Sequence, residues 1–179
     1  MADEPLVSKG IEGLLASWEA VSEQIRSLDR LLAGLARHDP VCREILMTAP
    51  GMGAITALTF KTVIDRPERF RRAKEVAAYV GLAPKRHQSG EVDRMGRISR
   101  CGDTLLRSYL FEAATVALLR VSRQSAPVTW AKALAKRVGL SKARVALARK
   151  LAVTLFAMWR KKEPFRWSEP AAIPLAQAA

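Results

Sequence analysis

The residues best suited to chemistry lie in one polar stretch, Lys85 to Asp103, which is rich in arginine and punctuated by glycine. The stretch has no helical period, and it carries Arg94, Arg97 and Arg100 at three-residue intervals. Exposed guanidinium groups attract polyanions such as nucleic acid. Because long ordered loops usually carry function, we expect a functional surface loop or short β-hairpin that turns near Ser89-Gly90.

A second candidate contact is the turn Pro50-Gly51-Met52-Gly53, which joins a short apolar helix to a second helix ending near Asp65. The pattern resembles a helix–hairpin–helix element. Gly51 and Gly53 let the backbone approach a phosphate closely, and the following helix presents free N–H groups and its positive dipole end. Such a contact is independent of sequence because it touches only the nucleic-acid backbone. A plain corner between bundle helices needs similar glycines, and this alternative stays open.

The charge of the chain indicates the kind of partner. Thirty Lys and Arg against 17 Asp and Glu give +13 over 179 residues, with −3 in residues 1–60, +6 in 61–110 and +10 in 111–179. This asymmetry favours a polyanion, nucleic acid first and an anionic membrane surface second. Ordinary glycine, proline and hydrophobic contents exclude collagen-like and wholly disordered chains. The longest apolar run, Leu151 to Trp159, is too short to span a membrane.

The apolar pattern predicts an all-α fold. We expect helices at 73–79, 104–120, 128–138 and 142–160, the first closed by Gly81. Asp103 and Ser141 are expected to cap the helices that follow them. The larger aromatic side chains are expected to pack in the core and tail rather than to stack on bases: Trp130, Phe156, Trp159, Phe165 and Trp167.

The first third of the chain predicts a long helix with a heptad seam of apolar residues, which is then stopped by Asp39-Pro40. The seam positions are Leu14, Trp18, Val21, Ile25, Leu28, Leu32 and Leu35. This seam predicts a homodimer or higher oligomer through residues 11–35; pairing with a missing domain or packing on the chain's own body are the alternatives. The expected domains are a coiled-coil or linker helix (1–40), a helical domain (41–165) and a flexible tail (166–179).

Two cysteines, Cys42 and Cys101, cannot build a disulfide scaffold, so a reducing cytoplasm is the expected location. They lack the paired spacing of a zinc site, and no metal ligand set is expected in this chain. Cys101 is expected to be a small buried residue. The acidic residues after Met1 and the absence of a following apolar core predict no signal peptide.

Several spaced motifs, in one order, resemble the carboxy-terminal domain of an insertion-sequence transposase family whose amino-terminal half is a RuvC-like DEDD nuclease fold. They are Leu46-Met-Thr-Ala-Pro-Gly-Met-Gly, Phe70, Ala77-Ala-Tyr-Val-Gly-Leu-Ala-Pro, His87-Gln-Ser-Gly, Gly96-Arg-Ile-Ser-Arg-Cys-Gly-Asp and Leu105-Leu-Arg. The resemblance covers roughly residues 10–165. Some recombinases of this family are guided by a bridging RNA, so DNA and a guide RNA are the partners that the resemblance implies.

The resemblance implies that Ser89 attacks a DNA phosphodiester and forms a serine–phosphate linkage with release of a 3′ end. A serine hydroxyl needs a base or metal to remove its proton, and the developing phosphoryl charge needs cations. His87 is close enough in sequence to polarise the hydroxyl, although an exposed, unpaired histidine is the simpler interpretation; Ser99 is the second candidate nucleophile. The cations that could bind nucleic acid are Lys85, Arg86, Arg94, Arg97 and Arg100.

The sequence departs from the family in having no DEDD half, whose carboxylates hold a divalent metal, expected to be Mg²⁺. Whether the chain is an enzyme by itself is therefore an open question at the level of sequence, because cleavage requires that half from elsewhere. The alternative function is a non-catalytic nucleic-acid-binding dimerisation module, a truncated transposase remnant. It keeps every basic residue and omits only the chemistry.

Overall fold

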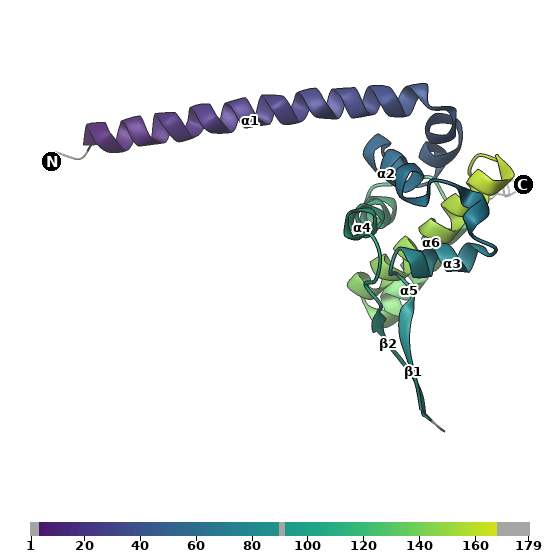
Figure 1. Cartoon of the computed structure of the whole chain (residues 1–179). Coiled ribbons are helices and arrows are strands. Elements are labelled where there is room, and N and C mark those ends of the chain that lie inside the picture. The colour runs from purple at the N-terminus through teal and green to yellow at the C-terminus, as the bar shows by residue number, and fades with distance from the viewer. Residues whose placement is uncertain (1–3, 90–91, 168–179) are drawn as a thin grey trace, which may run out of the picture.

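A computed structural model describes residues 4–89 and 92–167, with side chains described for 7–85 and 96–167. The fold is all-α, as predicted, with one two-stranded sheet (Figure 1). The elements in chain order are α1 (Glu4–His38), the π-helical turn η1 (Val41–Ile45), the 3₁₀ turn η2 (Leu46–Thr48), α2 (Ala54–Ile64), the 3₁₀ turn η3 (Pro67–Arg69), α3 (Ala73–Tyr79), β1 (Pro84–Ser89), β2 (Val92–Ile98), α4 (Thr104–Leu119), α5 (Ala126–Val138) and α6 (Leu140–Lys161).

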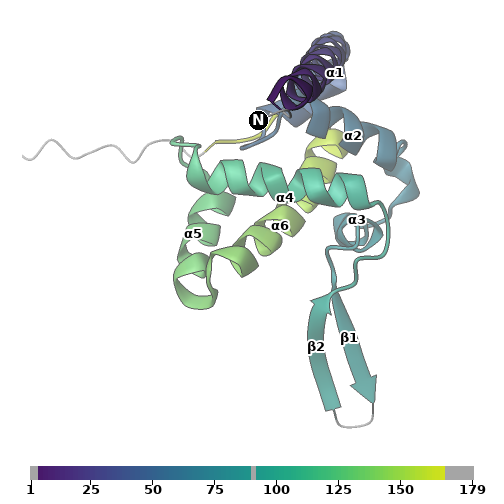
Figure 2. The same ribbon diagram turned by 90° about the vertical axis from the view of Figure 1, so that its left-hand side faces the viewer.

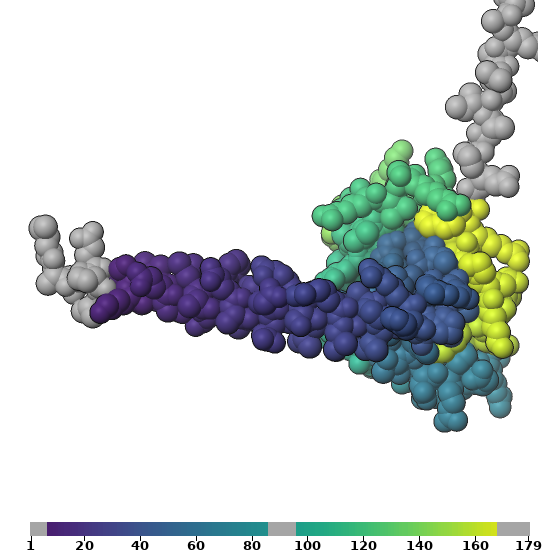
Figure 3. Space-filling model, turned by 90° about the horizontal axis from the view of Figure 1, so that it is seen from above, coloured from purple at the N-terminus to yellow at the C-terminus, as the bar shows by residue number. Residues whose placement is uncertain are grey.

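Helix α1 extends away from the rest of the molecule, which we call the body (Figures 1 and 3). Its 35 residues correspond to about 50 Å at the α-helical rise. Leu14 is 73% exposed and Trp18 is 65% exposed, whereas Ala36, near the end of the helix, is fully buried beside α2. The alternative that the seam packs on the chain's own body is therefore wrong for the first part of the helix.

The end of α1 is fixed by one aspartate. The helix stops at His38, as Asp39-Pro40 predicts, and the Asp39 carboxylate accepts a hydrogen bond from the Cys42 N–H at 2.9 Å. The same carboxylate pairs with the Lys61 ammonium of α2. Partial burial acts to raise the pKa of Asp39, but the Lys61 and Cys42 hydrogen bonds and the Lys61 charge outweigh it, so this pKa lies below its usual value.

The core of the body is built around α6, which packs against α3, α4 and α5 (Figure 2). Leu147, Leu151 and Leu155 recur at four-residue spacing on α6 and are fully buried, as expected for the inward stripe of an amphipathic helix. Phe70 joins this core through an edge contact to Phe156, with ring centroids 5.8 Å apart.

Helix starts were predicted with mixed success. The Asp103 side chain accepts a hydrogen bond from the Leu106 N–H at 2.6 Å, so the predicted cap of α4 is confirmed. Ser141 is not a cap: α6 begins one residue earlier, at Leu140, because Gly139 takes a positive φ of 88° and turns the chain directly from α5 into α6. A glycine achieves this turn at low cost because it has no Cβ.

The stretch between α3 and α4 forms an antiparallel hairpin, β1 and β2, that projects from the body (Figures 1 and 2). Its root is held by backbone hydrogen bonds from Ser99 N–H to Ala83 at 2.8 Å and from Arg100 N–H to Gly81 at 3.1 Å. A Cβ on Gly102, at φ +96°, would lie 1.8 Å from the Tyr79 carbonyl oxygen. The root therefore packs backbone against backbone on the end of α3.

The last described residues also contact the body. The Phe165 and Trp167 rings meet edge to face with centroids 5.1 Å apart, and the Arg123 guanidinium lies 4.6 Å from the Trp167 ring centroid. Within the predicted flexible tail, residues 168–179 lie outside the described residues. The three-domain division stays a prediction.

Candidate nucleic-acid interface

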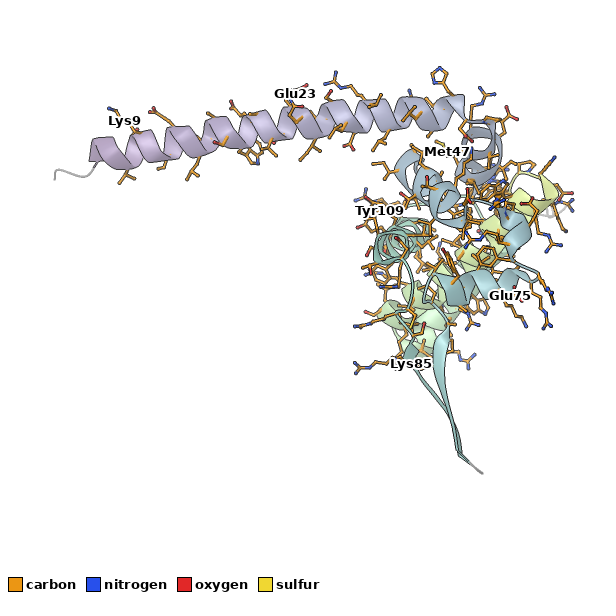
Figure 4. The ribbon with its side chains drawn as sticks, in the orientation of Figure 1. Lys9, Glu23, Met47, Glu75, Lys85 and Tyr109 are labelled. Carbon is orange, nitrogen blue, oxygen red and sulfur yellow. The ribbon has the colours of Figure 1, made fainter. Side chains whose placement is uncertain are left out.

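Three of the predicted cations lie exposed at the hairpin root. Lys85 belongs to β1, Arg97 to β2, and Arg100 to the segment that leads from β2 into α4. Figure 4 shows Lys85 where the hairpin leaves the body. Among the described side chains, no carboxylate lies within ion-pair distance of these three residues.

The backbone also places the remaining candidates of this stretch on the hairpin. Ser89 pairs with Val92 at the far end of the two strands, and His87 pairs with Arg94. Arg86 pairs with Met95, next to an irregularity in the register near the root. The side chains of these residues lie outside the described part of the chain, so the structure places their backbones alone.

The two glycines of the predicted helix–hairpin–helix lie elsewhere. Met47, beside that turn, is at the α2 side of the body, whereas Lys85 marks the opposite end (Figure 4). Gly51 has φ +76°, and a Cβ there would lie 2.1 Å from the carbonyl oxygen of Ala113 in α4. Gly53 is exposed, and a Cβ there would meet nothing within 4 Å. Packing against α4 thus accounts for Gly51, and the structure does not bring either glycine to the hairpin.

Beside the hairpin root lies a hollow that we call the basic cleft. Its volume is about 540 Å³, and its floor is formed by apolar residues of the hairpin root, α5 and α6, such as Ile98, Leu134 and Val145. Four cations from α3 and α6 surround it: Lys74, Lys142, Arg149 and Lys150. A neighbouring hollow of about 750 Å³ shares Lys142 and adds Arg97 and Arg100. The hairpin root and α6 therefore present one continuous cationic surface.

Sequence reasoning missed the α6 part of this surface. The signal that could have found it is a spacing: Arg149 and Lys150 follow Lys142 by seven and eight residues. Residues at these intervals lie on the same side of an α-helix. Trp130 was expected to be packed in the core, but it is 42% exposed at the cleft. The Lys150 ammonium lies 4.4 Å from its ring centroid, a cation–π distance.

The cysteines and the second candidate serine lie outside this cleft. Cys101 is exposed, so the prediction that it is buried is wrong, whereas Cys42 is fully buried. Burial, helped by the nearby Asp39 carboxylate, raises the pKa of the Cys42 thiol to about 11. Ser99 is half-buried at the hairpin root, where its carbonyl oxygen accepts from the Cys101 thiol at 3.6 Å.

Within the described ranges, no three His, Cys, Asp or Glu side chains gather in a way that could hold a metal ion. No helix in the same part of the chain is long and apolar enough to cross a bilayer.

Comparison with known proteins indicates the class of protein that this chain resembles. Residues 43–130, which run from η1 to the first turn of α5, match the model of the Transposase IS116/IS110/IS902 family.

The similarity to individual proteins extends over most of the chain. It is 31% identical over 145 residues to the transposase for insertion sequence element IS1111A of Coxiella burnetii, covering 80% of this chain and 40% of that protein. It is 35% identical over 148 residues to the putative transposase y4pF/y4sB of Sinorhizobium fredii, with 82% and 38% covered. The pilin gene-inverting protein of Moraxella lacunata is 32% identical over 150 residues, with 80% and 46% covered. The chain spans about two fifths of the length of these relatives.

Proposed function

We propose that the chain is the DNA-binding, strand-transfer part of an insertion-sequence transposase and acts in DNA transposition or recombination. The observation that carries the proposal is the cationic hairpin root inside residues 43–130, the segment that matches a transposase family. The relatives named as transposases and as a pilin gene-inverting protein favour the same activity. An arrangement of exposed surface cations binds the DNA backbone without reading its sequence.

Ser89 is the proposed nucleophile, and its position on the hairpin supports this role. It closes β1 at the end of the ribbon farthest from the body, where a DNA backbone can reach it. Its Oγ would lose its proton to a base and form a bond to phosphorus while the bond from phosphorus to the 3′ oxygen breaks, and the departing 3′ oxygen would take up a proton in exchange. His87 and Arg94 are paired with each other two register positions from Ser89. The backbone register therefore keeps both residues close to Ser89 along the ribbon.

The hairpin cations complete the proposed reaction. Lys85, Arg86, Arg94, Arg97 and Arg100 come from a single short ribbon and its root. A pentavalent phosphoryl centre carries more negative charge than the ground state, so fixed guanidinium groups stabilise it selectively. Gly53, at the open N-terminus of α2, is a separate proposed backbone contact.

The residues present do not fit the Mg²⁺ that the family resemblance implies, because the described part of the chain gathers no set of three possible ligands. We assign the metal to a DEDD half supplied elsewhere, and no step above depends on it. A guide RNA is a proposed partner through the same cations, because their contacts to a phosphate backbone do not distinguish DNA from RNA.

Helix α1 is the proposed oligomerisation element, with residues 11–35 pairing in a homodimer or higher oligomer. Trp18, Val21 and Leu28 are each more than half exposed, and an a/d seam of this kind is stable when it packs against another helix. Sedimentation equilibrium of the full chain should give a mass above the monomer, and Leu14→Asp with Val21→Asp should shift it to the monomer. A monomeric wild-type chain would contradict the proposal.

The test of the chemistry is capture of a covalent protein–DNA adduct. A junction DNA and a DEDD partner polypeptide are supplied, and the adduct is resolved on a denaturing gel. Ser89→Ala should abolish the adduct with DNA affinity changed less than twofold, while Ser99→Ala, the matched control, should retain it. An adduct that survives in Ser89→Ala shows that the nucleophile is another residue.

A non-catalytic nucleic-acid-binding dimerisation module is the second candidate, and it is favoured by the exposed cations of the hairpin root together with the exposed apolar seam of α1. Absence of any adduct, together with intact binding, would select it. Both functions require salt-dependent binding, with log K falling against log[salt] by about 0.9 per phosphate neutralised on duplex DNA. The double variant Arg97→Gln/Arg100→Gln should reduce that slope by about 2, whereas Lys132→Gln, an exposed cation of α5 outside the cleft, should leave it unchanged.

A further inference from the structure

The basic cleft differs chemically from the hairpin, because it combines an apolar floor with a cationic rim. Leu82, Pro84 and Ile98 from the hairpin root face Leu134 of α5 and Val145 of α6 across the hollow. Phosphate contacts alone do not require such a floor. A ligand that contacts both the apolar floor and the cationic rim of the cleft must have an apolar part as well as a negative charge.

The rim carries cations from two elements. Lys74 stands on α3, whereas Lys142, Arg149 and Lys150 stand on α6, and no carboxylate is among the described residues that line the hollow. Among the described side chains none of the four makes an ion pair. The uncompensated charge selects an anionic occupant, and its spread around the hollow fits several phosphates along a chain better than one isolated anion.

Trp130 supplies the feature that indicates a base. Its indole is 42% exposed at the cleft, and Lys150 covers it at 4.4 Å. A large aromatic left exposed beside cations is the arrangement on which unpaired nucleobases stack, with the cations following the sugar–phosphate chain. The volume of about 540 Å³ lies within the range of sites that enclose a small molecule. A base that is still paired and stacked inside a duplex cannot enter such a hollow.

We propose that the basic cleft binds an unpaired nucleotide of a single-stranded DNA segment, with the base against Trp130 and the apolar floor and the flanking phosphates on Lys74, Lys142 and Arg149. This inference rests on the proposed function and adds a substrate form to it, since strand transfer creates unpaired segments next to the cut. It assigns duplex binding to the hairpin and strand binding to the cleft.

The experiment compares two probes on the full chain by fluorescence anisotropy at one salt concentration: a 12-mer of thymidine and a mixed-sequence duplex of equal length. Trp130→Leu should weaken single-strand binding about tenfold, the order expected for one stacked base, and change duplex binding less than twofold. Lys142→Gln/Arg149→Gln should act in the same direction and checks the cleft independently of the tryptophan. Lys132→Gln, on the same helix as Trp130 but outside the hollow, should bind both probes as the wild type does.

The outcomes distinguish failure of the proposed function from failure of the proposed base site in the cleft. If the wild type binds neither probe, the proposed function itself fails. If it binds both but Trp130→Leu and the double variant leave single-strand affinity unchanged, or weaken both probes equally, the cleft does not bind an unpaired base and only this inference is overturned. Polyglutamate binding as tight as that of the thymidine 12-mer, and equally sensitive to Trp130→Leu, would assign the cleft to an acidic peptide instead.

Discussion

Substitution of Gly51 by alanine should destabilise the body severely, although the residue lies in a turn. A Cβ there would lie 2.1 Å from the Ala113 carbonyl oxygen and 3.0 Å from the Ala117 nitrogen. Both atoms belong to the backbone of α4, and Ala113 is only 2% exposed, so neither can retreat without moving the helix. The positive φ of 76° adds strain for any residue with a Cβ.

The cost can be estimated from these two contributions. A left-handed conformation costs an L-residue about 1–2 kcal/mol, and overpacking of a well-packed interior typically costs about 1–3 kcal/mol. We therefore expect Gly51→Ala to lower the free energy of unfolding by about 3 kcal/mol. For a domain of this size that corresponds to a fall in Tm of about 6–12 °C.

Gly53→Ala is the matched control, two residues away in the same turn. Its Cβ would meet nothing, and its φ of −97° suits any residue, so the stability should change by less than about 1 kcal/mol. Circular dichroism at 222 nm, followed through thermal unfolding, measures both variants. A Tm for Gly51→Ala within 2 °C of the wild type would refute the packing argument. A loss of DNA affinity in Gly53→Ala without a loss of stability would support the backbone contact proposed for that residue.

Three further predictions follow from single side chains. Asp103→Ala removes the carboxylate that accepts from the Leu106 N–H, and should lower the unfolding free energy by about 1 kcal/mol in chemical denaturation; Asp103→Ser should recover most of it, and a neutral Asp103→Ala would contradict the cap. Iodoacetamide at pH 8 should modify the exposed Cys101 but not the buried Cys42 until the protein is unfolded, and mass spectrometry showing both labelled in the folded protein would disprove the burial. The pKa of Cys42 rises from 9.0 to about 11 in the fold, so the stability that the neutral thiol contributes is complete below pH 9 and is lost as the pH rises toward 11. The difference in unfolding free energy between the wild type and Cys42→Ala should therefore narrow between pH 9 and pH 11. A difference that stays constant over this range would contradict the shifted pKa.

The helices were predictable because their signals are local. Asp103 precedes an apolar run with helical period, and the pair Asp39-Pro40 stops α1, so a few neighbouring residues determine each boundary. Ser141 failed as a cap for a reason that is not local to it. Gly139 turns the chain so tightly that α6 starts at Leu140, two residues before the predicted start at residue 142, and Ser141 is then simply a residue of the first helical turn.

The spacing of the arginines in the sequence did not predict how they are arranged on the hairpin. Arg94, Arg97 and Arg100 stand three residues apart, but a strand repeats every two residues and the register is irregular near the root. Arg94 therefore lies on the ribbon, Arg97 near its base and Arg100 beyond the last strand residue. The equal intervals in the sequence do not become one row of charges. The three backbones therefore lie at different distances from the body, and Arg97 and Arg100 reach the surface shared with α6.

The basic cleft was beyond sequence reasoning because close backbone packing creates it. Seen alone, Lys142 and Arg149 are ordinary cations on the solvated side of a helix. They become the rim of a site because Gly81 and Gly102 hold the hairpin root against the end of α3, which brings Ile98 over α6. A Cβ at either glycine would collide with a carbonyl oxygen at about 2 Å, so the root could not approach so closely. The glycines that look like loop residues in the sequence thus determine where the charges meet, and the site depends on them more than on any single cation.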